Sequence, residues 1–291
     1  MSDEDEIEAS RAPLLDHLNE LRSRLIICVG ALVVGFFACF FFAQQIYLFL
    51  LHPFEVAAAL LAQQKTGHAH GPFDLLFAMT GVTPLPENPQ GLKLVFTAPL
   101  EFFFTKMKLA GFGAVVITFP ILAFQLYRFV APGLYKKERG AFLPFLIASP
   151  VLFVLGAAMV YYIMLPFVLW FSLSQQIIGG NIQVELLPKV SDYLELVTKL
   201  LLAFGLCFQL PVVLSLAGLA GLVTGEQLSK FRRYAIVLIV FVAAIVTPPD
   251  PLSQIMLAVP IYLLYEASIW CVRLMQLRRA KAEREERALV G

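Results

Sequence analysis

Several long stretches of this chain contain no charged residue, and their length predicts helices that cross a membrane. A helix needs roughly 20 apolar residues to cross about 30 Å of hydrocarbon. The first such stretch runs from Leu25 to Phe54, and others recur along the chain. Six spans are predicted, at about 25–46, 102–127, 141–165, 194–216, 234–248 and 252–272. The pattern therefore predicts an all-α integral membrane protein.

The last two predicted spans are short. The apolar runs 234–249 and 251–265 would each reach only about 23 Å as a helix, because an α-helix rises 1.5 Å per residue. That length is less than the hydrocarbon thickness, so the bilayer must become thinner there or the polar flanks must reach the surface. Two interpretations stay open: ordinary short helices extended by polar ends, or a locally thinned bilayer that serves the protein's function.

Basic residues lie mostly on one side of the predicted spans. They occur in the amino-terminal arm, the loops after spans two and four, and the carboxy-terminal tail: Arg11, Arg22, Arg24, Arg128, Lys136, Lys137, Arg139, Lys230, Arg232, Arg233, Arg273, Arg278, Arg279, Lys281, Arg284 and Arg287. The opposite loops contain only Lys65, Lys93 and Lys189. Because cytoplasmic loops are enriched in Lys and Arg, both termini are predicted to be cytoplasmic.

The topology divides the chain into three parts. Residues 1–24 form a cytoplasmic arm with an interfacial helix, 25–275 the six-span domain, and 276–291 a basic cytoplasmic tail. The first external loop is long, and within it 54–64 and 72–79 are predicted as short helices that cap the external face. The acidic amino terminus differs from the basic start of a cleavable signal peptide, so the first apolar run is expected to be retained.

Composition agrees with the membrane prediction and excludes several kinds of chemistry. Hydrophobic residues make up 59% and charged residues 15% of the chain, against about 45–50% and 25% in soluble domains. A net charge of +1 gives no general basic field for nucleic acid. The four cysteines form no CxxC pair, and His68 and His70 alone are too few to hold a metal. No phosphate-binding loop is present, so we expect no cofactor and a process driven by an ion gradient.

Two acidic residues near the predicted cytoplasmic face are candidate binding groups. Glu20 lies on the polar side of a helix whose leucines share one face before the first span. It precedes Arg24 by one turn, so a simple ion pair is the plain alternative. Glu138 is a lone acid among basic residues in the loop after span two, where Pro132 breaks the helix. Neutralisation of its neighbours is the plain alternative there.

Polar residues inside the predicted spans are a second set of candidates, because such groups are costly in lipid and often functional. Gln209 lies in the middle of span four, where Glu195 and Lys199 could pair with each other. Glu266 lies in the last span. Thr247, Asp250 and Gln254 surround the Pro-rich turn between the short spans, where they could bind a polar stretch of a partner helix.

Four motifs together resemble the TatC family of twin-arginine protein translocases, in the family's order and with its number of spans. They are His17–Leu25, Ala98–Phe104, Phe129–Arg139, and Thr247–Asp250 with Gln254. The resemblance implies a core translocase subunit that binds twin-arginine signal peptides at the cytoplasmic face and scaffolds the transport of folded proteins across the bacterial inner membrane. It implies no enzyme activity, TatA- and TatB-like single-span partners, and self-association.

The resemblance also assigns roles to particular residues. Glu20 and Glu138 match the glutamates that contact the arginine pair. Arg22, Leu25, Phe129 and Pro132 match positions that shape the same site. Planar guanidinium groups favour bidentate carboxylate partners, a geometry that lysine cannot copy. Gln209, Thr247, Asp250 and Gln254 are expected to contact partner helices.

The chain departs from the family pattern at Gln209, where many members have a glutamate, and at Gly140, where a second basic residue is common. The first external loop is also longer than usual. A secondary transporter is the main alternative function, but no internal repeat is visible and few acids lie at mid-membrane depth. An intramembrane hydrolase is disfavoured because no histidine lies within a predicted span.

Overall fold

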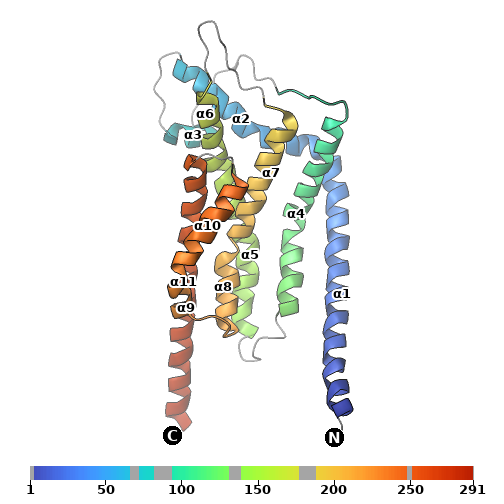
Figure 1. Ribbon diagram of the computed structural model, residues 1–291, viewed down its shortest axis with the longest axis vertical. Helices are drawn as coiled ribbons and strands as arrows, with labels where there is room; N and C mark the ends of the chain where they lie inside the picture. Colours follow the sequence, from blue (N-terminus) through green and yellow to red (C-terminus); the bar gives the residue numbers. More distant parts are fainter. Residues whose placement is uncertain are drawn as a thin grey trace.

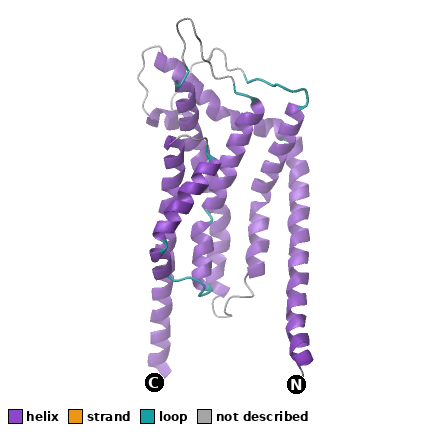
Figure 2. Cartoon of the chain, in the orientation of Figure 1, coloured by secondary structure: helices purple, strands orange, loops and turns teal. Residues whose placement is uncertain are grey.

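The protein is a bundle of long helices in the computed structural model, which describes residues 3–65, 72–81, 94–130, 139–176, 188–247 and 251–290 (Figures 1 and 2). The helices are α1 Asp3–Phe41, α2 Ala43–Lys65, α3 Pro72–Met79, α4 Glu101–Val130, α5 Arg139–Met159, the π-helix η3 Val160–Met164, α6 Leu165–Ser174, α7 Val190–Cys207, α8 Leu210–Leu219, α9 Gly225–Lys230, α10 Arg232–Val246 and α11 Pro251–Val290. Within these ranges the only extended pairing is an isolated bridge between Val95 and Lys189.

Six helical segments of the described chain are long and apolar enough to cross a membrane. They are Leu18–Phe41, Ala43–Leu61, Glu101–Phe129, Pro144–Ser174, Val190–Leu219 and Ser253–Arg278. The prediction of an all-α protein with multiple membrane helices is thereby confirmed. The second segment belongs to α2, which runs across one end of the bundle, whereas the 15-residue α10 lies beside α11 (Figure 1).

Helix bounds differ from the predicted spans at several points. The helix of the third span continues beyond 165 through η3 and α6 to Ser174. Pro166, which has no N–H, stands where the π-helix η3 passes into α6, so the change of hydrogen-bonding pattern falls beside it. The fourth span instead breaks at Phe208 and Gln209, immediately before α8, which has Pro211 in its first turn. The predicted cap helix 54–64 is the second half of α2, and 72–79 is α3.

Both ends of the described chain lie at the same end of the bundle, opposite α2 and α3 (Figure 1). The start of α1 and the end of α11 extend beyond the other helices there. α1 runs from Asp3 to Phe41 without a break, so the amino-terminal arm and the first span form one helix. α1 packs mainly along α4 at the edge of the bundle.

Glycines allow α5 and α7 to pack closely at the centre of the bundle. A Cβ atom added at Gly156 would lie 2.8 Å from the carbonyl oxygen of Phe204, and one at Gly205 would lie 2.5 Å from the Phe153 ring. Phe153 and Phe204 are among the most deeply buried side chains. Close backbone approach through small residues is a common way to join helices in lipid.

Two tyrosines bind the backbone of α2 next to its internal proline. Pro53 has no N–H and cannot donate to the carbonyl of Phe49 one turn earlier. The hydroxyl of Tyr161, in η3, donates to that carbonyl at 2.8 Å, and the Tyr161 ring stacks on the Phe49 ring. Tyr193 of α7 donates to the next carbonyl, that of Leu50, at 2.6 Å. These contacts fix α2 across the spans.

Candidate functional site

Glu20 lies on α1 close to the last turns of α4. Its carboxylate pairs with Arg24 one helical turn later. The same guanidinium donates to the backbone carbonyl of Gln125 in α4, with 3.4 Å between nitrogen and oxygen. The Arg24 side chain is only 14% exposed, whereas that of Glu20 is 36% exposed. Arg24 therefore joins α1 to α4 and leaves part of the Glu20 carboxylate open to an incoming group.

The structure describes only some of the other residues expected at this site. Arg22 and Leu25 are exposed on α1, and Phe129 is partly buried in the last turn of α4. Pro132 and Glu138 lie outside the described residues. The structure thus places Glu20 beside the helix from whose end the Glu138 loop departs, and it does not place Glu138 itself.

Gln209 makes a helix–helix contact inside the chain. The Ser149 hydroxyl of α5 donates to its side-chain oxygen at 2.7 Å, and its amide nitrogen donates to the Ser149 carbonyl at 3.0 Å. The side chain is buried at the break between α7 and α8. An ionised glutamate here would accept from the hydroxyl but could not donate to the carbonyl. The amide therefore suits this pairing of α5 with α7 better than an ionised carboxylate would.

The expected partner-contact residues near the last turn are partly satisfied within the chain. Thr247 is buried and its hydroxyl donates to the Ala243 carbonyl at 2.9 Å. The Gln254 amide donates to the Val240 carbonyl of α10 at 3.2 Å. Asp250 lies outside the described residues. Gln254 therefore joins the start of α11 to α10, whereas the Thr247 bond lies within the last turn of α10.

Glu266 joins the two last spans near the opposite end of α10. Its carboxylate accepts from Arg232 at 2.7 Å and from the Tyr262 hydroxyl at 2.9 Å. The Nε atom of Arg232 is buried without a hydrogen-bond partner in the described structure. Glu266 was a candidate from the sequence, but its partner was not predictable, because Arg232 is 34 residues away on another helix.

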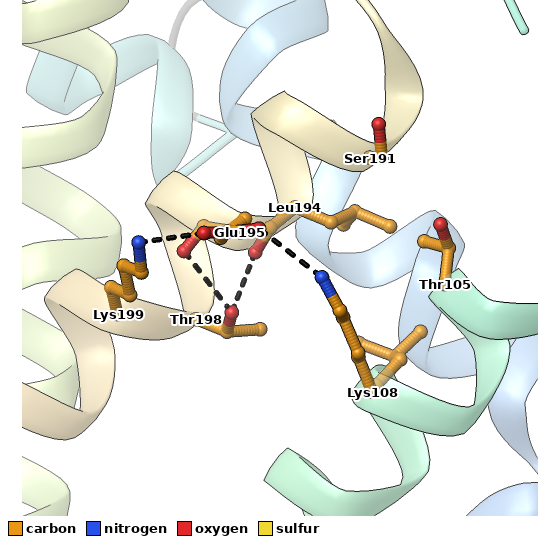
Figure 3. Close-up of a pocket in the computed structure, with 8 residues that line it drawn as sticks. Thr105, Lys108, Ser191, Leu194, Glu195, Thr198 and Lys199 are labelled. Atoms are coloured by element: carbon orange, nitrogen blue, oxygen red, sulfur yellow. Dashed lines mark hydrogen bonds and ion pairs between the residues drawn. The ribbon is translucent and has the colours of Figure 1, made fainter. Parts of the chain in front are cut away.

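A charged cluster occupies a cavity of about 290 Å³ between α4 and α7 (Figure 3). Glu195 pairs with Lys199 at 2.6 Å, as one sequence interpretation allowed, and also with Lys108 of α4 at 3.2 Å. Thr105 and Ser191 line the cavity above them. Lys108 was not among the residues predicted from the sequence, although it is one of two lysines, with Lys106, inside the predicted span 102–127.

Next to this cavity, Glu101 connects the start of α4 to the start of α7. One carboxylate oxygen accepts from the Ser191 hydroxyl at 2.6 Å, and the other accepts from the Thr97 backbone N–H at 2.7 Å and the Ala98 N–H at 3.2 Å. Among the described residues, no group of three or more His, Cys, Asp or Glu side chains could hold a metal ion. His68 and His70 lie outside that part.

These observations define a multi-pass helical membrane protein with an acidic group at the end of the bundle where both chain ends lie, and with polar contacts between its spans. The family model for the Sec-independent protein translocase protein TatC matches residues 16–260. The chain belongs to the TatC family, whose members are multi-pass proteins of the bacterial membrane.

Relatives and solved structures agree over nearly the whole chain. A Sec-independent protein translocase protein TatC from Magnetococcus marinus is 42% identical over 96% of this chain and 90% of its own length. The TatC of Aquifex aeolicus is 34% identical over 94% of this chain and 99% of its own length. A crystal structure described as the twin arginine translocase receptor TatC has 34% identity and a TM-score of 0.67, covering 89% of this chain and 98% of that one.

Proposed function

We propose that this chain is the signal-recognising core subunit of a twin-arginine translocase in the bacterial inner membrane, not an enzyme, and that an ion gradient drives transport. The observation that carries the proposal is the TatC match over residues 16–260 together with the position of Glu20 against the end of α4. The bundle end at which α1 begins and α11 ends faces the cytoplasm, because the predicted loops on that side carry most of the basic residues.

The signal binds through its two arginines. A carboxylate has two oxygens with about four lone-pair sites, so Glu20 can accept from an incoming guanidinium while it keeps Arg24. Glu138 supplies the second carboxylate from the loop after α4, and Arg22, Leu25, Phe129 and Pro132 shape the same site. Bidentate geometry favours arginine over lysine, which carries a point charge.

Single-span TatA- and TatB-like subunits and further copies of this chain are the proposed partners. They dock along the later spans, near Gln209 and the turn that contains Thr247, Asp250 and Gln254. Support comes from α10, whose exposed apolar side chains include Val237, Leu238 and Phe241. The helix has only 15 residues, which is short for a membrane span. A helix of that length thins the bilayer beside it.

A binding measurement with matched variants tests the proposal. A fluorescent twin-arginine signal peptide is titrated onto the full chain in nanodiscs, beside a twin-lysine peptide. Glu20→Gln and Glu138→Gln should each weaken twin-arginine binding by about tenfold or more, the size of one lost charge-assisted hydrogen bond. Glu226→Gln is the control, because Glu226 is exposed on the short helix α9, away from α1.

Two outcomes would count against this assignment. Equal affinity for the arginine and lysine peptides would show that the planar geometry of the guanidinium group does not contribute to binding. An equal loss in Glu226→Gln would show that only the total negative charge at this end of the bundle matters. Small-solute uptake that survives loss of both glutamates would instead favour a secondary transporter.

A further inference from the structure

The cavity between α4 and α7 has an excess of positive charge that the proposed signal site does not use. Lys108 and Lys199 approach the single carboxylate of Glu195 from opposite sides (Figure 3). Among the side chains that line this space of about 290 Å³, two ammonium groups and one carboxylate leave one positive charge. The carboxylate of Glu101, next to the cavity, is bonded to Ser191, Thr97 and Ala98 and pairs with neither lysine. At about 30 Å³ for one water, this space holds several polar groups.

Both lysines keep hydrogen-bonding capacity for a ligand. An ammonium group has three N–H donors, and within the described chain each of these groups contacts one oxygen of Glu195. The Lys108 side chain is 69% exposed and that of Lys199 is 63% exposed. The remaining donors are therefore accessible to a second anion, which can accept from both helices at once.

By helix length, the backbone at the cavity lies just inside the hydrocarbon layer, within reach of the lipid headgroups for a lysine side chain. The 30 residues of α4 make a helix about 45 Å long, about 15 Å longer than the hydrocarbon layer. If the excess is shared between the two ends, about 7 Å of helix stands in each headgroup layer. Lys108 is seven residues from the start of α4, about 10 Å along the axis, and its long side chain can reach the headgroups.

The surroundings of the cavity on α4 face lipid. Phe102, Phe103 and Phe104 precede it and are exposed. Lys106, in the same stretch, holds its ammonium 4.8 Å from the centre of the Phe102 ring and does not line the cavity. An anion that reaches Lys108 therefore arrives beside an apolar, lipid-facing surface, in a layer where phosphate is the abundant anion.

We propose that Lys108 and Lys199 bind the phosphate of an anionic phospholipid, in the leaflet at the end of the bundle that carries α2 and α3. Glu195 holds one ammonium group on each of its two oxygens and limits the charge of the empty site. The lipid would bridge α4 and α7 at the point where Glu101 and Ser191 already join their starts. This site is separate from the Glu20 region, which lies beside the other end of α4.

Native mass spectrometry of the full chain in a neutral detergent tests the proposal. The protein is titrated with phosphatidylglycerol and, separately, with phosphatidylcholine of the same acyl chains. Lys108→Gln and Lys199→Gln should each weaken phosphatidylglycerol binding about five- to tenfold, the effect of one cation near a lipid surface. Lys106→Gln, with the same charge change on the same helix, should leave binding unchanged.

Glu195→Gln should have the opposite effect on phosphatidylglycerol binding. It frees both ammonium groups and raises the charge of the cavity, so phosphatidylglycerol should bind more tightly. A variant that merely misfolds cannot give this result. Inorganic phosphate and glycerol phosphate are tested as competitors, and a headgroup site with acyl-chain contacts should favour the lipid over both.

Several results would overturn the proposal. Unchanged phosphatidylglycerol binding in Lys108→Gln and Lys199→Gln would do so, as would an equal loss in Lys106→Gln. Equal affinity for free phosphate would make this a soluble-anion site. Loss of a co-purifying single-span partner in the two lysine variants, with lipid binding intact, would assign the cavity to an acidic side chain of that partner.

Discussion

The contribution of the Tyr161 hydrogen bond to the stability of the protein should depend on Pro53 in α2. The hydroxyl donates at 2.8 Å to the Phe49 carbonyl, which Pro53 deprives of its helical partner. Tyr161→Phe removes this donor but keeps the ring, which stacks on Phe49 with centroids 4.5 Å apart. The Tyr161 side chain is only 5% exposed, so water cannot easily replace the hydroxyl.

The expected loss of stability depends on whether the Phe49 carbonyl keeps a hydrogen-bond donor. In the natural chain, Tyr161→Phe leaves the Phe49 carbonyl without either partner, which costs about 1–3 kcal/mol in the free energy of unfolding. In a Pro53→Ala background, the new backbone N–H can donate to the same carbonyl. The cost of Tyr161→Phe should then fall by about 1 kcal/mol, and this difference is the coupling energy of a double-mutant cycle.

The four proteins of this cycle can be compared by unfolding in mixed micelles, with tryptophan fluorescence as the signal from Trp170 and Trp270. Tyr162→Phe is the control, because Tyr162 is partly exposed next to Tyr161 in the same π-helix. Equal costs of Tyr161→Phe with and without Pro53 would refute the reasoning. A similar cost for Tyr162→Phe would show that the loss is not specific to the α2 carbonyl.

Three further substitutions probe contacts between helices, each measured by the same unfolding assay. Ser149→Ala removes the donor to the buried Gln209 oxygen and should cost about 1–3 kcal/mol; no loss would mean that another group or water replaces the hydroxyl. Glu266→Gln should cost about 1–2 kcal/mol, less than a fully buried pair, because Arg232 is partly exposed; the natural stability would contradict this. Gly205→Ala should cost about 1–3 kcal/mol by forcing a methyl group against an α5 ring, and a neutral result would show that α5 and α7 can separate freely.

The local pairs were predictable from the sequence because they lie on one helix. Glu20 with Arg24, and Glu195 with Lys199, are separated by four residues, and an α-helix brings such positions together regardless of the rest of the fold. The apolar stretches were equally predictable, since the hydrocarbon layer demands a run of uncharged residues. The roles of these pairs in binding stay predictions.

Helix ends were less predictable because prolines act differently according to their place in a helix. The third span was predicted to end at about 165, yet Pro166 stands where η3 passes into α6 and the helix continues to Ser174. Pro53 lies inside α2 without ending it, because Tyr161 supplies a donor to the carbonyl that the proline leaves unsatisfied. No local pattern around either proline contains that information.

The sequence by itself determined that the protein crosses a lipid bilayer, which family its motifs resemble, and which ion pairs form within single helices. Only the tertiary structure decided that Lys108 joins Glu195 from 87 residues away, and that Gln209 meets Ser149 from 60 residues away. Spacing along one helix fixes which side chains share its face. Which face meets which neighbour depends on the rotation and register of packed helices, and these are set by close contacts such as those at Gly205.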